Sequence, residues 1–355
     1  MEFIYEYGLF LAQVVTFVAA ILVVAASLVG MGQRQKAEQQ EGHIEVRDVN
    51  EKYRHIGQQI QHMVVEPQQL KVELKAEKKA EKKAAKAKAK AAKKKRDDSA
   101  EVERRKRLYI LDFDGDIKAS ATDNMREEIS AVLPQIKPGD ELLVRVESPG
   151  GMVHSYGLAA SQLQRIRDAG VPLTIAVDKV AASGGYMMAC VANQIVAAPF
   201  AIIGSIGVLA QLPNFHRLLK KNDIDFELFT AGEYKRTVTM FGENTDKGRE
   251  KFSEELEETH TLFKDFVRAN RPGLDIAKVA TGEIWYGQQA LEVGLVDELQ
   301  TSDAFVQAKL ADWDVYEVKF VYKKNWQEKL GLAAEGALEK AFLRVWQRAQ
   351  QRNNY

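Results

Sequence analysis

The stretch Lys179-Val-Ala-Ala-Ser-Gly-Gly-Tyr186 follows an apolar run, Val171-Pro-Leu-Thr-Ile-Ala-Val177, and this order predicts a strand that leads into a tight turn. Small residues before Ser183 let the backbone bend sharply, and the two glycines after it let a helix begin with its amide groups directed outward. The logic is that of a nucleophile elbow, although alanines stand where the G-x-S-x-G pattern has its first glycine. A helix cap by Ser183 is the simpler alternative.

A second glycine turn, Glu147-Ser-Pro-Gly-Gly151, lies upstream at the end of an apolar strand expected over residues 141–146. In a parallel sheet the carboxyl ends of adjacent strands share one edge, and ligands bind there. The amides of Gly151 and Gly184 are therefore placed to converge on one oxyanion. Neither turn is specific alone, but the pair favours an acyl-transfer site.

Four motifs together resemble a known family, the serine–lysine signal peptide peptidases, and most closely its SohB-type inner-membrane branch. They are Ser148-Pro-Gly-Gly151, Ala182-Ser-Gly-Gly-Tyr186, Gly204-Ser-Ile-Gly207 and Gly232-Glu-Tyr-Lys235. The resemblance covers roughly residues 107 to 300. It implies the α/β fold that the Clp protease and crotonase families share.

The same resemblance implies roles for single residues. Ser183 is expected as the nucleophile and Lys235 as the general base, with Ser205 as a hydrogen-bonding neighbour of the lysine. Gly151 and Gly184 are expected to form the oxyanion hole. A lysine acts as a base only where burial lowers its pKa from the reference value of about 10.4. Bound substrate and apolar neighbours would have to keep Lys235 dry.

Other chemistries remain open from the residues alone. Lys235 stands next to Arg236, as in a solvated surface pair, and a Ser-His-Asp triad is the rival scheme. His216 is the main candidate for that triad, but no Asp is placed by sequence to orient it. No His, Cys and Asp cluster has metal-site spacing, and the glycine turns lack the lysine-serine ending of a phosphate loop. Neither a metal nor a cofactor is expected.

The globular part is expected to be α/β with a mostly parallel sheet, because strand-like and helix-like segments alternate. Strands are predicted over residues 108–113, 141–146, 171–177, 194–198, 224–229 and 315–322, and helices over 122–136, 155–168, 184–191, 214–221 and 246–269. Lys235 follows the strand predicted at 224–229, which would hold it against the sheet edge. An apolar stripe from Trp326 onward predicts a C-terminal amphipathic helix.

The N-terminal segment is expected to be a transmembrane anchor. No charged residue occurs between Glu6 and Arg34, and residues 8–31 are apolar for long enough to cross about 30 Å of hydrocarbon. A cleaved signal peptide is the alternative, but its basic start is missing and the apolar run is too long. The predicted organisation is an anchor over 1–34, a charged tether over 35–106, a peptidase domain over 107–312, and a strand with a helix over 313–355.

The tether is dominated by Lys, Ala and Glu between Lys71 and Arg107, so it cannot form an apolar face. It lacks interleaved aromatic residues, which argues against nucleic acid, and anionic lipid is the nearer partner. Arg34 and Lys36 favour a cytoplasmic catalytic domain, whereas the resemblance places it on the outer side. The single cysteine, Cys190, excludes an intramolecular disulfide and fits either side.

These observations predict a serine endopeptidase, anchored in the bacterial inner membrane by one pass, that cleaves peptides or unfolded segments with a Ser-Lys dyad. Because the chain has room for one α/β unit, the resemblance implies a closed homo-oligomeric ring in which a neighbouring subunit supplies the lysine. A non-catalytic peptide-binding scaffold and a crotonase-type acyl-thioester enzyme are the alternatives from other classes.

Overall fold

The structure, a computed structural model, describes residues 42–66 and 104–322, together with the separate positions 8, 15–17, 75, 79, 82, 83 and 86. The folded unit treated below spans Ile44–Lys319. Most of the predicted anchor and the whole of the predicted C-terminal helix lie outside the described residues. Within the part of the chain that is described, no helix is both long enough and apolar enough to cross a membrane.

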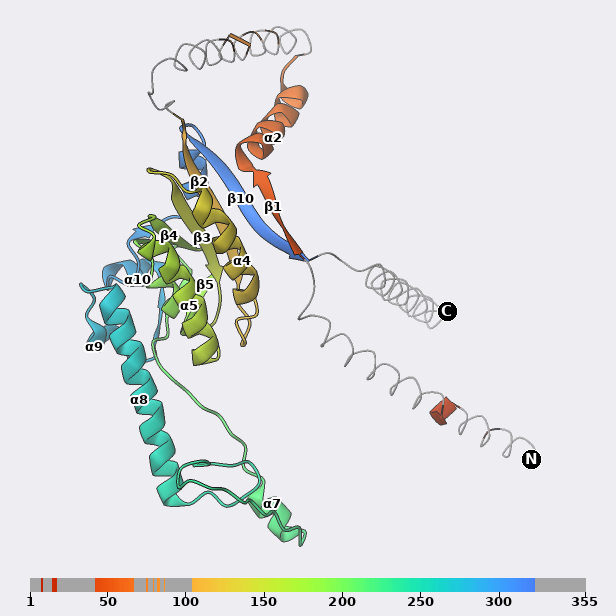
Figure 1. The fold of residues 1–355 in the computed structure, drawn as a ribbon, viewed down its shortest axis with the longest axis vertical. Helices are drawn as coiled ribbons and strands as arrows, with labels where there is room; N and C mark the ends of the chain where they lie inside the picture. The colour runs from red at the N-terminus through yellow and green to blue at the C-terminus, as the bar shows by residue number, and fades with distance from the viewer. Residues whose placement is uncertain are drawn as a thin grey trace, which may run out of the picture. The chain divides into compact units, whose positions relative to one another are not determined.

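The main sheet has seven strands in the order β1-β10-β2-β3-β4-β6-β9, and every neighbouring pair from β10 to β9 is parallel (Figure 1). The α/β fold with a mostly parallel sheet is therefore confirmed. The strands are β1 Gly42–Asp48, β10 Trp313–Tyr322, β2 Lys106–Asp114, β3 Glu141–Glu147, β4 Leu173–Val177, β6 Gln194–Ala197 and β9 Glu298–Leu299.

Helices cover both faces of this sheet. Successive residues of β2 and β3 point to opposite faces, so each strand contributes to two separate apolar cores. The larger core includes Leu111 and Val144 and is covered by α4 (Thr122–Val132), α5 (Val153–Asp168), α6 (Gly184–Ala189) and the C-terminal half of α8 (Asp246–Asn270). The smaller core includes Ile110 and Leu143 and is covered by α11 (Ser302–Lys309) and the start of α2 (Val49–Val64).

A small second sheet stands beside the first and carries the turns of interest. Its order is β5-β7-β8, with β5 Val180–Ala182 parallel to β7 Ile202–Gly204, and β7 antiparallel to β8 Ile284–Tyr286. An isolated parallel bridge between Ser148 and Ala181 connects the end of β3 to this sheet. The short elements η1 Leu133–Gln135, α7 His216–Lys221, α9 Ile276–Val279 and α10 Gly287–Glu292 complete the fold.

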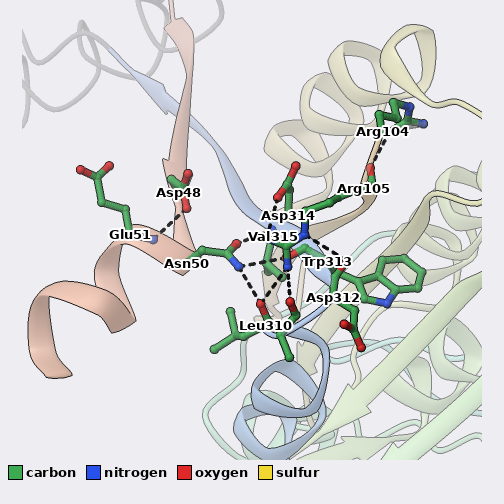
Figure 2. A network of polar contacts seen from close by, with 11 residues as sticks. Asp48, Asn50, Glu51, Arg104, Arg105, Leu310, Asp312, Trp313, Asp314 and Val315 are labelled. Atoms are coloured by element: carbon green, nitrogen blue, oxygen red, sulfur yellow. Dashed lines mark hydrogen bonds and ion pairs between the residues drawn. The ribbon is translucent and has the colours of Figure 1, made fainter. Parts of the chain in front are cut away.

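The segment that was predicted as tether differs in its first part, because residues 42–64 form β1 and α2. Asp48 caps the helix by accepting a hydrogen bond from the amide of Glu51, 2.9 Å away. The Asn50 amide donates to the carbonyls of Leu310 and Trp313 and accepts from the amide of Val315 (Figure 2). One side chain thus ties the start of α2 to the strand β10.

The strand predicted over residues 224–229 is wrong. These residues form neither helix nor strand and belong to no sheet. The alternating side chains Ile224, Phe226 and Leu228 are all exposed, since no sheet edge lies beside them to pair with the backbone. Residues 208–245, called the extension below, leave the body after β7, include α7 and return to the N-terminal end of α8 (Figure 1).

Candidate active site

Ser183 occupies a strained turn between β5 and α6. Its backbone has φ 52° and ψ −117°, a conformation that costs a non-glycine residue about 1–3 kcal/mol and is concentrated at functional sites. The amide of Ser183 donates to the carbonyl of Gly204 at 2.8 Å, which fixes the turn from the side of β7. The side chain makes no capping hydrogen bond to α6, although Ser183 is at the N-cap position. Ser183 therefore does not act as a simple helix cap.

The Gly150–Gly151 turn lies against the Ser183 turn. Gly150 has φ 92°, and a Cβ placed on it would lie 2.7 Å from the amide nitrogen of Gly184 and 2.7 Å from Cβ of Ser183. Only glycine allows so close an approach of the two backbones. Among the described residues, neither the amide of Gly151 nor that of Gly184 has a hydrogen-bond acceptor. Gly184 directly follows Ser183, and Gly151 belongs to the turn that packs against it, so both free donors are in the two turns that meet at Ser183. An oxyanion hole needs two such donors.

Ser205 lies next to Ser183 because their strands are paired in register. Ala182 of β5 is opposite Gly204 of β7, and each is followed by a serine with a positive φ, which is 50° at Ser205. The amide of Ser205 donates to the carbonyl of Glu283 at 2.7 Å. Both serines are half-buried, so their side chains have partial access to solvent. The structure therefore brings together Ser183, Ser205, Gly151 and Gly184.

Lys235 is not part of this group within one chain. It is exposed in the extension, where the neighbouring Tyr234 ring lies 5.8 Å from Nζ of Lys247 and 5.6 Å from Nζ of Lys251, near the start of α8. Farther along that helix, His260 Nε2 lies 3.2 Å from the carbonyl oxygen of Ile206, next to Ser205. At 1.5 Å per residue, His260 is roughly 14 Å along the axis from Lys251 and roughly 20 Å from Lys247.

A histidine triad finds no support within one chain. His216 begins α7 in the extension, and its amide donates to the side chain of Asn214. His154 is exposed at the start of α5, and the ring of His260 is engaged with the carbonyl of Ile206. None of the three is placed to take a proton from Ser183.

Two residues that the sequence did not single out for a role support the glycine turn. Ser148 and Tyr156 are fully buried, and their hydroxyl oxygens lie 2.6 Å apart. The amide of Gly150 donates to Ser148 Oγ at 3.1 Å. Tyr156 is on the buried face of α5, where the sequence pattern indicates only an ordinary core residue. The only sequence signal was the position of Ser148 inside the Ser-Pro-Gly-Gly motif.

Comparison with known proteins identifies relatives over most of the chain. Residues 2–163 match the N-terminal region of peptidase family S49, and residues 165–315 match peptidase family S49. The chain is 52% identical over 329 residues to a probable protease SohB of Haemophilus influenzae, covering 93% of this chain and 92% of that protein. It is 46% identical over 309 residues to a probable protease SohB of Buchnera aphidicola subsp. Schlechtendalia chinensis, covering 86% and 99%.

Among solved structures, the 1510-N membrane-bound stomatin-specific protease in complex with a substrate peptide aligns with a TM-score of 0.40 and 13% identity, covering 64% of this chain and 96% of that one. The sequence matches are far closer, and they agree with one another over nearly the whole length. The chain therefore belongs to peptidase family S49, as a protease of the SohB type.

Proposed function

We propose that the protein is a membrane-anchored serine endopeptidase in which Ser183 is the nucleophile and Lys235 is the general base. The observation that carries the proposal is the strained turn at Ser183, flanked by two amides, of Gly151 and Gly184, that have no acceptor among the described residues. A turn in which the serine side chain does not cap the helix, and in which two amide donors are left free, is suited to acyl transfer. The substrates would be peptides or unfolded segments close to the bacterial inner membrane.

The proposed chemistry follows the usual steps of a serine–lysine protease. The neutral amine of Lys235 removes the proton from Ser183 Oγ while that oxygen attacks the peptide carbonyl. The carbonyl oxygen takes the negative charge and is held by the amides of Gly151 and Gly184. The lysine then gives its proton to the leaving amine, and an acyl-enzyme on Ser183 remains. Water, activated by the same amine, hydrolyses this ester and restores both residues.

A neighbouring subunit is the proposed source of the lysine. Lys235 is exposed and distant from Ser183 in one chain, so a single protomer offers neither contact with the serine nor shielding from water. The extension that carries it is rich in exposed apolar side chains, including Leu209 at 78% and Phe229 at 87% exposure. A surface of this kind favours a protein–protein contact. A head-to-tail contact that closes into a ring would bury the extension and dry the amine.

The membrane attachment is proposed from the sequence alone. Residues 8–31 are apolar and uncharged, and they precede the folded unit that begins at Ile44. A single pass there would hold the catalytic unit near the bilayer, and the Lys-rich residues from Lys71 onward would contact anionic headgroups.

Reaction with a fluorophosphonate probe tests the nucleophile, and co-expression tests the shared site. Ser183→Ala should abolish labelling and casein cleavage, and Lys235→Ala should reduce turnover by about 10²–10⁴-fold. The matched control Lys221→Ala, which removes another exposed lysine of the extension, should keep full activity, as should His216→Ala.

The two inactive variants should regain partial activity when they are produced together, because some interfaces then pair an intact Ser183 with an intact Lys235. Mixed oligomers that show no activity above either variant alone would exclude the shared site. A labelled residue other than Ser183, or a folded protein that does not react at all, would favour a different nucleophile or a peptide-binding scaffold.

A further inference from the structure

We propose that Tyr156 is a positioning residue that acts through Ser148 to hold the Gly150–Gly151 turn in the orientation that an oxyanion requires. The inference rests on the proposed function, because it assigns a task to residues behind the proposed oxyanion hole. Tyr156 touches no substrate. Its effect reaches the reacting carbonyl through one buried serine and one backbone amide.

The polar contacts form one chain with a defined direction. The Tyr156 hydroxyl donates to the carbonyl of Asp116 at 2.7 Å, and a phenol has a single proton to give. The 2.6 Å contact between Tyr156 and Ser148 must therefore use the serine proton, with the phenol oxygen as acceptor. The lone pairs of Ser148 Oγ then remain free to accept from the amide of Gly150 at 3.1 Å.

This direction decides which amide of the glycine turn is available. The Gly150 amide is committed to Ser148, so it points into the protein and not toward a substrate. The next amide, that of Gly151, is the one left without an acceptor among the described residues. If the hydrogen bonds from Tyr156 through Ser148 to Gly150 are broken, the peptide plane that holds the Gly150 amide is free to rotate. The next peptide plane, which holds the Gly151 amide, then rotates with it. Displacement of a catalytic group by about 1 Å can cost roughly 100-fold in rate.

The Tyr156 ring supports the second donor as well. A Cβ on Gly184 would collide with Cγ, Cδ2 and Cβ of Tyr156, so the backbone of the Ser183 turn lies directly against this side chain. The loop after β2 completes the arrangement, because the carbonyl of Ile117 accepts from the amide of Met152 at 2.9 Å. Burial raises the pKa of Tyr156, so its proton stays in place at the pH of any ordinary assay. Tyr156 thus packs against the Ser183 turn directly and reaches the Gly150–Gly151 turn through Ser148.

The test uses the full-length protein in detergent and compares three variants. Tyr156→Phe keeps the ring under Gly184 and removes only the hydroxyl, and Ser148→Ala breaks the same chain one residue nearer to Gly150. Tyr186→Phe is the matched control, because its hydroxyl is also buried and also donates to a carbonyl, that of Leu295 at 2.9 Å, but it is no part of this chain. Fluorescein-labelled casein serves as the unfolded substrate for kcat and KM.

We expect Tyr156→Phe and Ser148→Ala each to lower kcat by about 10- to 100-fold with KM within about twofold, because the loss arises only when the oxyanion forms. The double variant should lose little more than either single variant, since both break one chain. Affinity for a peptide boronate, which forms a tetrahedral adduct, should fall by a similar factor. Tyr186→Phe should leave kcat unchanged although it also lowers the thermal midpoint.

Three results would overturn the proposal: an unchanged kcat in a folded Tyr156→Phe protein, additive losses in the double variant, or an equal loss of kcat in Tyr186→Phe. If Tyr156→Phe does not fold, Ser148→Ala alone decides by the same criteria. Failure of the proposed function itself is separate, since the unsubstituted protein would then show no fluorophosphonate label on Ser183.

Discussion

Adding one methyl group at Gly150 should disable the site more than it destabilises the fold. The Cβ of Gly150→Ala would meet the Gly184 amide nitrogen and Ser183 Cβ at 2.7 Å and the carbonyl oxygen of Ala182 at 2.8 Å. Ordinary contacts of a Cβ begin near 3.4 Å, so the two turns must separate by several tenths of an ångström. All three obstacles are backbone or Cβ atoms, which cannot turn away as the end of a long side chain can.

The cost of this change has two parts. A positive φ costs an alanine about 1–2 kcal/mol relative to glycine. The overlap adds about 1–3 kcal/mol, as is typical when a packed site is overfilled. Together they predict a loss of about 2–5 kcal/mol in the free energy of unfolding. Because the shift moves the proposed donor Gly151 away from Ser183 and from the second donor, Gly184, activity should fall by about 100-fold or more in protein that is still folded.

Gly170→Ala supplies the control for this prediction. Gly170 also has a positive φ, 72°, but a Cβ there would meet nothing within 4 Å. Gly170→Ala should therefore lose only about 1–2 kcal/mol, which is what a positive φ costs an alanine, and its rate of fluorophosphonate labelling should be unchanged. Urea unfolding followed by tryptophan fluorescence measures the stability, and gel fluorescence of the labelled protein measures the rate. A folded Gly150→Ala protein that labels as fast as Gly170→Ala would refute the close approach of the two turns.

Two further predictions concern stability. Asn50→Ala should lower the free energy of unfolding by about 1–3 kcal/mol, because it leaves the amide of Val315 and the carbonyl of Trp313 without this partner. Urea unfolding measures the loss. A loss no larger than that of Asn222→Ala, a variant of an exposed amide, would contradict the prediction. Hydrogen bonds from the backbone and side chain of Ser120 lower the pKa of Asp116. The carboxylate therefore stabilises the fold fully above its unfolded pKa of about 3.9. This stabilisation is lost as the pH falls through the lower pKa of the folded state. Asp116→Asn should therefore flatten the acid limb of the stability curve below about pH 4, and an unchanged acid limb would disprove this.

The sequence predicted the centre of the fold well because local and long-range preferences agree there. The run before Ser183 is apolar on both faces, as a strand covered by helices on both sides must be, and the Gly-Gly pair marks the helix start. The strand expected at 224–229 failed for the opposite reason. Its alternation of Ile224, Phe226 and Leu228 is typical of a half-buried strand, but periodicity does not tell whether a sheet edge is available.

The strand β1, the first in the sheet order, was missed for a related reason. Residues 42–48 contain four charged or titratable side chains in a short stretch, so the sequence placed them in the charged tether and not in a strand. The contribution of Tyr156 was invisible as well, because its two partners, Ser148 and Asp116, lie 8 and 40 positions away and are brought together only by the sheet.

The position of β10 affects how the chain can be assembled during synthesis. This strand lies between β1 and β2, both of which are made long before it, and its pairing joins Trp313 to Lys106. At a translation rate of about 5–20 residues per second, β2 must wait roughly 10–40 s with one edge unpaired. An open parallel edge is a template for wrong pairing with other chains. The nascent protein therefore passes through a period in which its sheet is vulnerable to aggregation, and this period ends only when β10 has left the ribosome.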